Sequence, residues 1–309
     1  MDFNHILVPI VRAGIELAEH DIPRAMTQAV SIAQSSNASI SLVAYDNPLP
    51  PSASYWSGIE EELFEFKQKF YERLLARFEE YAVFNNVRAT SKVVFGSPVK
   101  EILSSIETDS IDLVVKEAPH VDLLGVHRLS GDDLSLLRLT RIPVWLIPEN
   151  TPERNTRNVL LALDIHANDQ SMNKTMLQHA YEIATQHKDG KLHVIHTWLS
   201  PFEEYPKNYF GRHLSHAETV NDIDNTLIKE HREYIDKLLH TLNLENNDAI
   251  SIHIVNGTAS TEISKLAQSL PADLMVIGSH ARTGIDRFFN GNTAENISAA
   301  TQCPLLVFH

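Results

Sequence analysis

The chain has a single cysteine, Cys303, among its 309 residues, so no disulfide can form within it. This shortage fits a reducing compartment, and the place of Cys303 beside a terminal apolar strand favours a small buried hydrophobe. Basic residues are also few, since 26 of them face 40 acidic residues and leave a formal charge of -14. A field of that sign opposes phosphate backbones and anionic membrane surfaces. Neither nucleic acid nor a membrane is therefore an expected partner.

Long apolar runs are missing as well. No segment approaches the ~18–20 apolar residues that a membrane-spanning helix needs. Residues 1–5 lack the cationic start of a signal peptide. We therefore expect a cytoplasmic protein. The chain has no Walker loop, no GxGxxG fingerprint and no signature of a nucleophile with its base. These absences favour a binding protein over an enzyme, and a slow ATPase is the catalytic alternative that remains.

The 16 histidines raise the question of a metal site. His193 and His196 are three residues apart in a predicted strand, so their side chains point to opposite faces. His213 and His216 could share one face of a helix, but no cysteine or clear carboxylate completes a set of ligands. His231 lies on the apolar face of a predicted helix, as a core histidine does. We therefore expect neither a metal site nor a catalytic residue.

The sequence does contain a pattern that occurs twice. Three residues recur at a constant separation of 161: Gly96 with Gly257, Asp112 with Asp273, and Pro143 with Pro304. A period of this length is far longer than that of a solenoid repeat and marks whole domains. Two domains are also the prior for a chain of this length. We expect one domain at 1–150 and another at 156–309, with the polar segment 151–155 as the linker.

Both halves show the same order of predicted elements, with short apolar runs that alternate with amphipathic helices. The expected strands lie at 5–10, 39–45, 90–95, 111–115 and 144–147, and again at 158–163, 191–198, 251–255, 274–277 and 305–308. A long helix is expected at 60–82 in the first half. This alternation predicts an α/β fold of two tandem, doubly wound domains, each with a five-stranded parallel sheet. Ligands of such domains bind at the carboxyl ends of the strands, near a topological switch point.

The second half carries the better candidate site. Its predicted strand 274–277 leads into Gly278, and residues 291–293, Gly-Asn-Thr, later open a helix. Backbone N–H groups at the start of a helix bind anions. Asp164 ends the first strand at the same sheet edge, where a carboxylate can bind a ribose hydroxyl or a Mg²⁺ ion that also contacts phosphates. The same residues can instead serve only turns and helix caps, so both interpretations stay open on these grounds.

At these residues the chain resembles the universal stress protein family, and the resemblance covers both halves. The loop 278–295 and the degenerate first half are most similar to the tandem-domain E-type members. ATP-binding members of the family have Gly, two residues, Gly, nine residues, Gly, and then Ser or Thr. This chain has Gly278, Ala281, Gly291 and Asn292 at those four positions. Ala281 crowds a close phosphate and is strained if its φ is positive, whereas Asn292 still donates and accepts hydrogen bonds.

The resemblance implies a nucleotide site in the second domain. The implied cofactor-binding residues are Leu163, Asp164 and Val255 at the adenine cleft, Gly278, His280, Gly291, Asn292 and Thr293 at the phosphates, and also Ile277 and Ala281. The implied ligand is ATP or another adenine nucleotide, with Mg²⁺, which acts as a signal in a stress-response regulator. In the first half Val11 replaces the aspartate, Glu117 replaces the first glycine and residues 130–131 replace the last pair. We therefore expect no nucleotide there, because Glu117 would place a carboxylate beside a phosphate.

A second class of function stays open beside this one. The segments 48–56 and 198–216, which follow the second strand of each half, are long and rich in proline and aromatic residues. They either pack over their own domain or form an apolar ligand lid or a protein-partner surface. In that second case the chain is an interaction or sequestration module with relic nucleotide sites. Family dimers further imply an intramolecular pseudo-dimer of the two domains, formed through the strands 144–147 and 305–308.

Overall fold

The computed structural model describes residues 3–11, 22–47, 59–118, 121–123, 126–149, 151, 156–165, 170–200, 217–278 and 303–309. It divides into two compact units. The first unit comprises Met1–Glu153 with Gln302–Val307 and His309, and the second comprises Arg154–Thr301 with Phe308. Within the described part of the chain, every helix is too short or too polar to span a bilayer.

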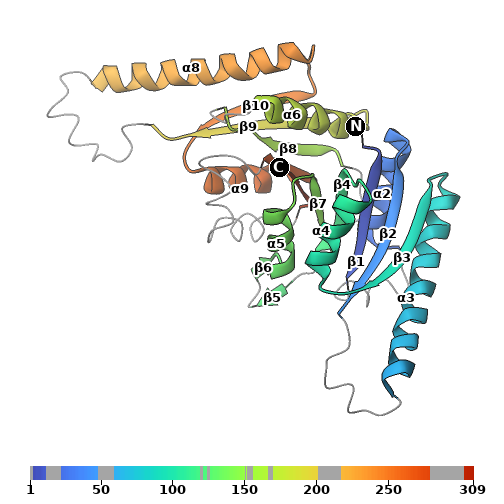
Figure 1. Ribbon diagram of the computed structural model, residues 1–309. Helices are drawn as coiled ribbons and strands as arrows, with labels where there is room; N and C mark the ends of the chain where they lie inside the picture. Colours follow the sequence, from blue (N-terminus) through green and yellow to red (C-terminus); the bar gives the residue numbers. More distant parts are fainter. Residues whose placement is uncertain are drawn as a thin grey trace. The chain divides into compact units, whose positions relative to one another are not determined.

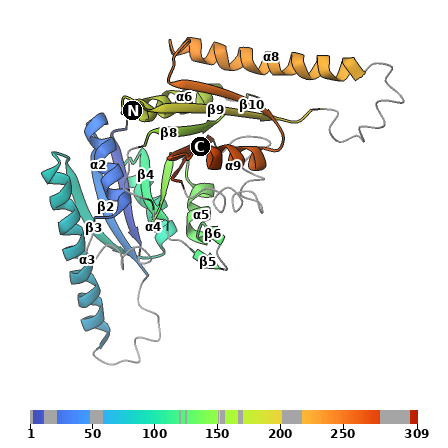
Figure 2. The same ribbon diagram turned by 180° about the vertical axis from the view of Figure 1, so that it is seen from behind.

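The first unit is a mostly parallel sheet between two layers of helices (Figures 1 and 2). Its elements follow the order β1 (His5–Val11), α2 (Arg24–Ser36), β2 (Ser39–Asp46), α3 (Ile59–Phe84), β3 (Ala89–Phe95), α4 (Pro98–Thr108), β4 (Leu113–Ala118), β5 (Val121–Leu123), β6 (Val126–Arg128), α5 (Gly131–Leu139) and β7 (Val144–Pro148). The strands β5 and β6 pair with each other as an antiparallel hairpin. Right-handed crossovers place α2 and α3 on one face and α4 and α5 on the other.

The order of strands in this sheet is β12-β7-β4-β1-β2-β3, where β12 is Leu305–Phe308. Strand β1 lies between β2 and β4 and is parallel to both. Its residues Ile6, Leu7 and Val8 are fully buried, as expected for a strand that is covered on both faces. The chain adds β2 and β3 on one side of β1 and then crosses to β4 on the other. The switch point of the first unit therefore lies between β1 and β4.

The second unit repeats this arrangement. Its described elements are β8 (Asn158–Ala162), α6 (Gln170–Ala184), β9 (Lys191–Trp198), α8 (Ala217–Thr241), β10 (Ile250–Asn256), α9 (Ala259–Ser269) and β11 (Leu274–Gly278). These strands lie in the order β11-β8-β9-β10 and are parallel. Helices α6 and α8 cover one face and α9 the other (Figure 1). The switch point of this unit lies between β8 and β11.

Residues that recur in the sequence have the same roles in both units. The carboxylate of Asp112 accepts hydrogen bonds from the backbone N–H groups of Asn4 and His5, where β1 begins. The carboxylate of Asp273 does the same for Arg157 and Asn158 at β8. A carboxylate at this place joins the start of the first strand to the start of the fourth. The repeat therefore reflects a repeated structural requirement.

The repeated glycines are explained by a close approach. A Cβ atom on Gly96 would lie 2.6 Å from Cγ of Glu101, and one on Gly257 would lie 2.7 Å from Cγ of Glu262. Gly257 also has a φ of 147°, which L residues with side chains rarely adopt. Both glycines follow the third strand of their unit and precede a helix. A larger residue at either position would displace the glutamate from the first turn of that helix.

The last strand of the sequence belongs to the sheet of the first unit. Strand β12 is antiparallel to β7, with Leu306 opposite Trp145, and these two side chains are almost fully buried. The pairing of these segments is the one that the sequence analysis expected. The packing of the two units against each other as a pseudo-dimer stays a prediction, as do the domain limits 1–150 and 156–309.

The predicted α/β fold class is confirmed. The expected helix at 60–82 is α3, which begins one residue earlier and ends two residues later. The hairpin of β5 and β6 was not predicted, because two strands of three residues each give too short a pattern to recognise.

Replacing Leu306 by alanine is expected to lower the free energy of unfolding by roughly 2–5 kcal/mol, because the side chain is fully buried against β7. Urea-induced unfolding measures the change. The matched control is Leu139→Ala, since Leu139 is 60% exposed at the end of α5 and should shift the midpoint little. Equal midpoints for the two variants would contradict the placement of β12 in this core.

Candidate functional site

The predicted site of the second half falls partly within the described residues. Leu163, Asp164, Val255, Ile277 and Gly278 are described, whereas His280, Ala281, Gly291, Asn292 and Thr293 lie outside the described residues.

Gly278 ends β11, and Asp164 follows the end of β8 by two residues, so both lie where the strands that flank the switch point terminate. Strand β11 is parallel to β8, with Val276 opposite Leu161. In this register Ile277 and Gly278 continue β11 alongside the residues that lead to Asp164. The two predicted site residues therefore lie at the carboxyl edge of adjacent strands, as the sequence analysis expected. This is the edge at which ligands of doubly wound sheets bind.

The backbone before Asp164 is held by hydrogen bonds on both sides. The N–H of Leu163 donates to the carbonyl of Ile195 over 2.9 Å. The carbonyl of Leu163 accepts from Nδ1 of His196 over 3.0 Å, and that carbonyl can only accept, so Nδ1 carries the proton. The buried amide of Asn173 donates to the carbonyl of Asp164 over 2.8 Å. The segment that presents Asp164 is thus fixed by its own unit.

Gly278 has a packing reason to be glycine. A Cβ atom there would lie 3.1 Å from Sδ of Met172 and 3.3 Å from Cε of Met176, both on α6. This packing gives a structural reason for the glycine, and both the turn interpretation and the phosphate interpretation of Gly278 stay open. Val255 lies on β10 opposite Thr197 of β9, so β9 separates it from β8. Its contribution to an adenine cleft would have to be made across β9.

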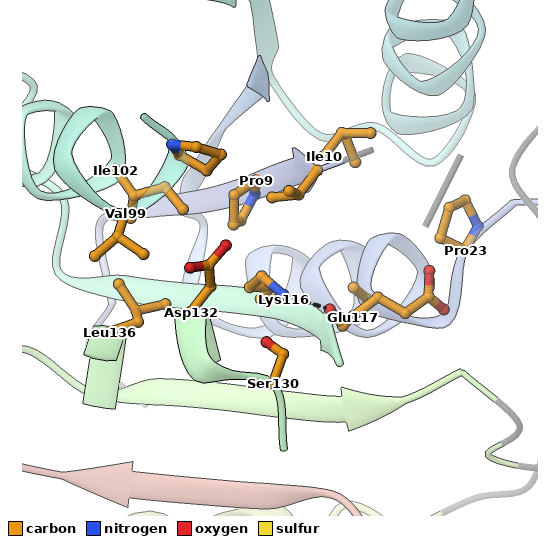
Figure 3. A pocket seen from close by; sticks show the side chains of 13 residues that line it. Pro9, Ile10, Pro23, Val99, Ile102, Lys116, Glu117, Ser130, Asp132 and Leu136 are labelled. Carbon is orange, nitrogen blue, oxygen red and sulfur yellow. Dashed lines mark hydrogen bonds between the residues drawn. The ribbon is translucent and has the colours of Figure 1, made fainter. Parts of the chain in front are cut away.

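The corresponding switch point of the first unit contains a pocket of about 120 Å³ (Figure 3). Pro9, Ile10 and Val11 contribute from the end of β1, and Lys116 and Glu117 contribute from the end of β4. Because one water molecule needs about 10–15 Å³ of such space, the pocket has room for several waters or a small organic molecule. The fold therefore provides a cavity at this edge even in the half that lacks the glycine loop.

A buried ion pair lies at one wall of this pocket. Nζ of Lys116 is 2.7 Å from Oδ1 of Asp133, and both side chains are almost completely buried. Lys116 also donates to the carbonyl of Glu117 over 2.9 Å. The other carboxylate oxygen of Asp133 accepts from the hydroxyl of Ser130 over 2.6 Å. It also accepts from the backbone N–H of Ser130 over 3.2 Å, as part of the capping box that begins α5. The positive charge of Lys116 is thus neutralised within the protein.

Sequence reasoning did not find this ion pair. At the repeat separation of 161, Lys116 corresponds to Ile277 and Asp133 to Ala294, so the pair exists in one half only. The available signal was a lysine within the apolar run that forms β4. Its partner is 17 residues away in sequence, and only the fold brings the two together.

Glu117 occupies the start of a helix. Its Oε1 accepts a hydrogen bond of 3.2 Å from the backbone N–H of Arg24, the first residue of α2. Burial raises the pKa of Glu117 to about 7, the nearby charge of Glu149 adds to the rise, and the hydrogen bond from Arg24 opposes it. A helix N-terminus is a place where an anion binds readily. Here the protein supplies that anion from its own side chain.

These features define a class of protein: a doubly wound α/β chain built from two similar units. The first unit has a pocket at its switch point, and the second has the ends of two adjacent parallel strands there. Residues 155–309 match the universal stress protein family, and the chain belongs to this family. The identification made from the sequence is confirmed. The relatives named next also bear out its similarity to the E-type members.

The chain is 26% identical to Universal stress protein E of Escherichia coli K12 over 221 residues. This alignment covers 70% of the chain and 66% of the relative, so the chain spans just under two thirds of that relative's length. A universal stress protein from Archaeoglobus fulgidus has a similar structure, with a TM-score of 0.62, 16% identity and coverage of 99% of this chain and 96% of the other. A protein of the same kind from Pseudomonas aeruginosa UCBPP-PA14 has a TM-score of 0.65 at 22% identity, with coverage of 99% and 93%. At these identities the structures support the fold alone.

Replacing Lys116 by methionine should lower the free energy of unfolding by roughly 3–5 kcal/mol, because Asp133 would remain buried without its cation. The double variant Lys116→Ile/Asp133→Ala carries the residue types of the second half and removes both charges of the pair. It should recover most of the loss, apart from about 1 kcal/mol for the missing helix cap. Urea-induced unfolding compares the two. If the single variant is as stable as the unmodified chain, the ion pair is not buried as described.

Replacing Glu117 by glutamine should stabilise the protein above pH 7. The folded state raises the pKa of this carboxyl from 4.5 to about 7. The stability that comes from its bound proton is complete below about pH 4.5 and is lost as the pH rises to about 7, a change on the order of 3 kcal/mol. Glutamine stays neutral and can still accept from Arg24. The difference in the free energy of unfolding between Glu117→Gln and the unmodified protein, measured by urea unfolding, should therefore be small at pH 4.5 and large at pH 8. The variant Glu107→Gln, at an exposed position, should show no such difference.

Proposed function

We propose that this chain is a tandem stress-response regulator whose second domain binds ATP or a related adenine nucleotide, with Mg²⁺, as a signal. The observation that carries the proposal is that Asp164, two residues after β8, and Gly278, at the end of β11, lie at the carboxyl ends of the two strands that flank the switch point of the second unit. A nucleotide at this edge would place its ribose or its metal ion near Asp164. Its phosphates would lie beyond Gly278, where the following helix begins in the predicted loop.

The local structure suits such a site. The hydrogen bonds of Leu163 and Asn173 hold the backbone that presents Asp164, so little ordering of this segment would oppose binding. Gly278 leaves the edge free of a side chain between the two strands. The single-residue departures at Ala281 and Asn292 would weaken the phosphate contacts without blocking the sugar and base.

The first domain is proposed not to bind nucleotide. Where the second unit has Ile277 and Gly278, the first has Lys116 and Glu117. Lys116 cannot serve a phosphate, since Asp133 already neutralises it at 2.7 Å. Glu117 already occupies the N-terminus of α2. An incoming phosphate would meet a carboxylate in place of free N–H groups, which costs several kcal/mol at close range.

The alternative of an apolar interaction module has less support in the described residues. The aromatic segment 48–56 and most of 198–216 lie outside them. Trp198, which begins the second segment, is 7% exposed and packs edge-on against His231. At this residue the segment packs on its own unit. The interaction module stays a prediction, and the nucleotide test decides between the two functions.

Isothermal titration with ATP and Mg²⁺ tests the proposal. The unmodified chain should bind, and Asp164→Ala should weaken binding about tenfold or more, because a charged group loses its partner. The matched control is Asp189→Ala, which removes an exposed carboxylate in the loop after α6. The first-unit variant Glu117→Gln should leave ATP affinity unchanged.

Mass spectrometry of the natively purified protein provides a second measurement. Bound adenine nucleotide supports the proposal. Absence of bound nucleotide, together with no calorimetric signal at millimolar ATP and added Mg²⁺, would show that the second domain is not a nucleotide site and would favour the interaction module.

A further inference from the structure

The pocket at the switch point of the first unit is lined by acidic groups, whereas a phosphate site is lined by positive or N–H groups (Figure 3). Its ionisable lining residues are Lys116, Glu117 and Asp132. The charge of Lys116 is balanced by Asp133 outside the pocket lining. The charge left to face a ligand is therefore that of two carboxylates. Asp132 is exposed at the first turn of α5, whereas Glu117 is the more buried of the two.

The rest of the lining is mostly apolar. Ile102 of α4 and Leu136 of α5 are almost fully buried, and Val99, Pro9 and Pro23 complete the apolar walls. In Figure 3 these side chains surround the opening between the ends of β1 and β4, with the Asp132 carboxylate directed toward Pro9. A pocket that is apolar apart from a few placed polar groups is typical of small-molecule sites.

We propose that this pocket binds a small organic cation, an alkylammonium with a short apolar body. Its ammonium group would pair with the Glu117 carboxylate. Its hydrocarbon part would lie against the apolar side chains of α4 and α5. The ligand differs from the nucleotide proposed for the second domain, and the inference does not depend on that proposal.

The surroundings of Glu117 favour a cation over other ligands. The hydrogen bond that the described residues give its carboxyl group comes from the backbone N–H of Arg24 on α2. Glu149, after β7, adds a repulsive charge, and Lys116 on β4 and Arg24 contribute weaker attraction. Nζ of Lys116 is directed at Asp133 and at the Glu117 carbonyl. An ammonium group would supply a counter-ion with direct hydrogen bonds, whereas an anion would meet Glu117 and Asp132.

The geometry predicts a pH dependence with a definite sign. Burial holds the pKa of Glu117 at about 7 in the free protein, so the carboxylate is mostly protonated at pH 6 and mostly ionised at pH 8. An alkylammonium, like the lysine side chain, stays charged over this range. Its affinity should therefore rise about tenfold from pH 6 to pH 8. An uncharged ligand of the same shape should show no such rise.

A ligand-observed NMR titration of the full chain with butylammonium tests the proposal, with 1-butanol and butanoate as probes of the same size. At pH 8 butylammonium should bind at least tenfold more tightly than either probe. Glu117→Gln should remove this preference and its pH dependence, while Asp132→Asn should weaken binding less, because Asp132 is exposed. Glu107→Gln is the matched control outside the pocket and should change nothing. Urea unfolding confirms that each variant is folded.

Three results would overturn the inference. Equal binding of butylammonium and 1-butanol would make the pocket an apolar cavity without charge selection. A preference for butylammonium over 1-butanol that survives in Glu117→Gln would place the cation elsewhere. No binding of butylammonium at tens of millimolar would exclude the site. Each result is separate from the nucleotide proposal, because ATP affinity is measured independently and is expected to be the same in Glu117→Gln.

Discussion

The constraint on which the structure depends is the way in which a parallel sheet must be connected. Each pair of adjacent parallel strands needs a crossover, and a right-handed crossover places its helix on one particular face. In both units the chain adds two strands on one side of the first strand and then crosses to the other side. In the first unit the connections that leave β1 and β4 lead to α2 and α5, which lie on opposite faces of the sheet. The edge between them stays open, and Asp164, Gly278 and the pocket of the first unit all lie at such an edge.

The two units treat this open edge in different ways. The second unit has the Asp164 carboxylate on a hydrogen-bonded backbone segment beside Gly278. Met172 and Met176 leave little room for a side chain at Gly278. The first unit presents a glutamate at the N-terminus of α2 and neutralises its lysine internally. In the first unit the Glu117 carboxylate accepts from the N-terminus of α2. The helix that corresponds at the repeat separation to the predicted phosphate loop of the second unit is α5, and Ser130 and Asp133 cap its start. Both helix N-termini at this edge of the first unit are therefore satisfied by side chains of the protein itself.

Much of the fold was predictable because it depends on patterns along the chain. Apolar runs alternate with amphipathic helices, and Asp112 and Asp273 or Gly96 and Gly257 recur at a fixed separation, since each meets the same local requirement. Pairings between distant residues were not predictable in this way. Lys116 and Asp133 are brought together only by the packing of α5 on the sheet, and the pocket depends on how side chains from five elements, β1, α2, α4, β4 and α5, pack. The charge of Glu117 was recognised as incompatible with phosphate, but its bond to Arg24 could not be read from the sequence.

The polar groups of the first unit suggest more than the loss of a ligand. A unit that had only lost its phosphate loop could fill this edge with apolar side chains. The second unit has such a side chain, Ile277, at the position that Lys116 occupies in the first. Instead it keeps three ionisable groups there, of which Lys116 and Asp133 are almost fully removed from water. Buried ion pairs of this kind add little net stability compared with apolar residues, and a carboxyl whose pKa is held near 7 lowers stability at neutral pH. Groups that cost stability and line a cavity are characteristic of binding sites. The proposed cation would offset part of that cost, since its charge would stabilise the ionised form of Glu117.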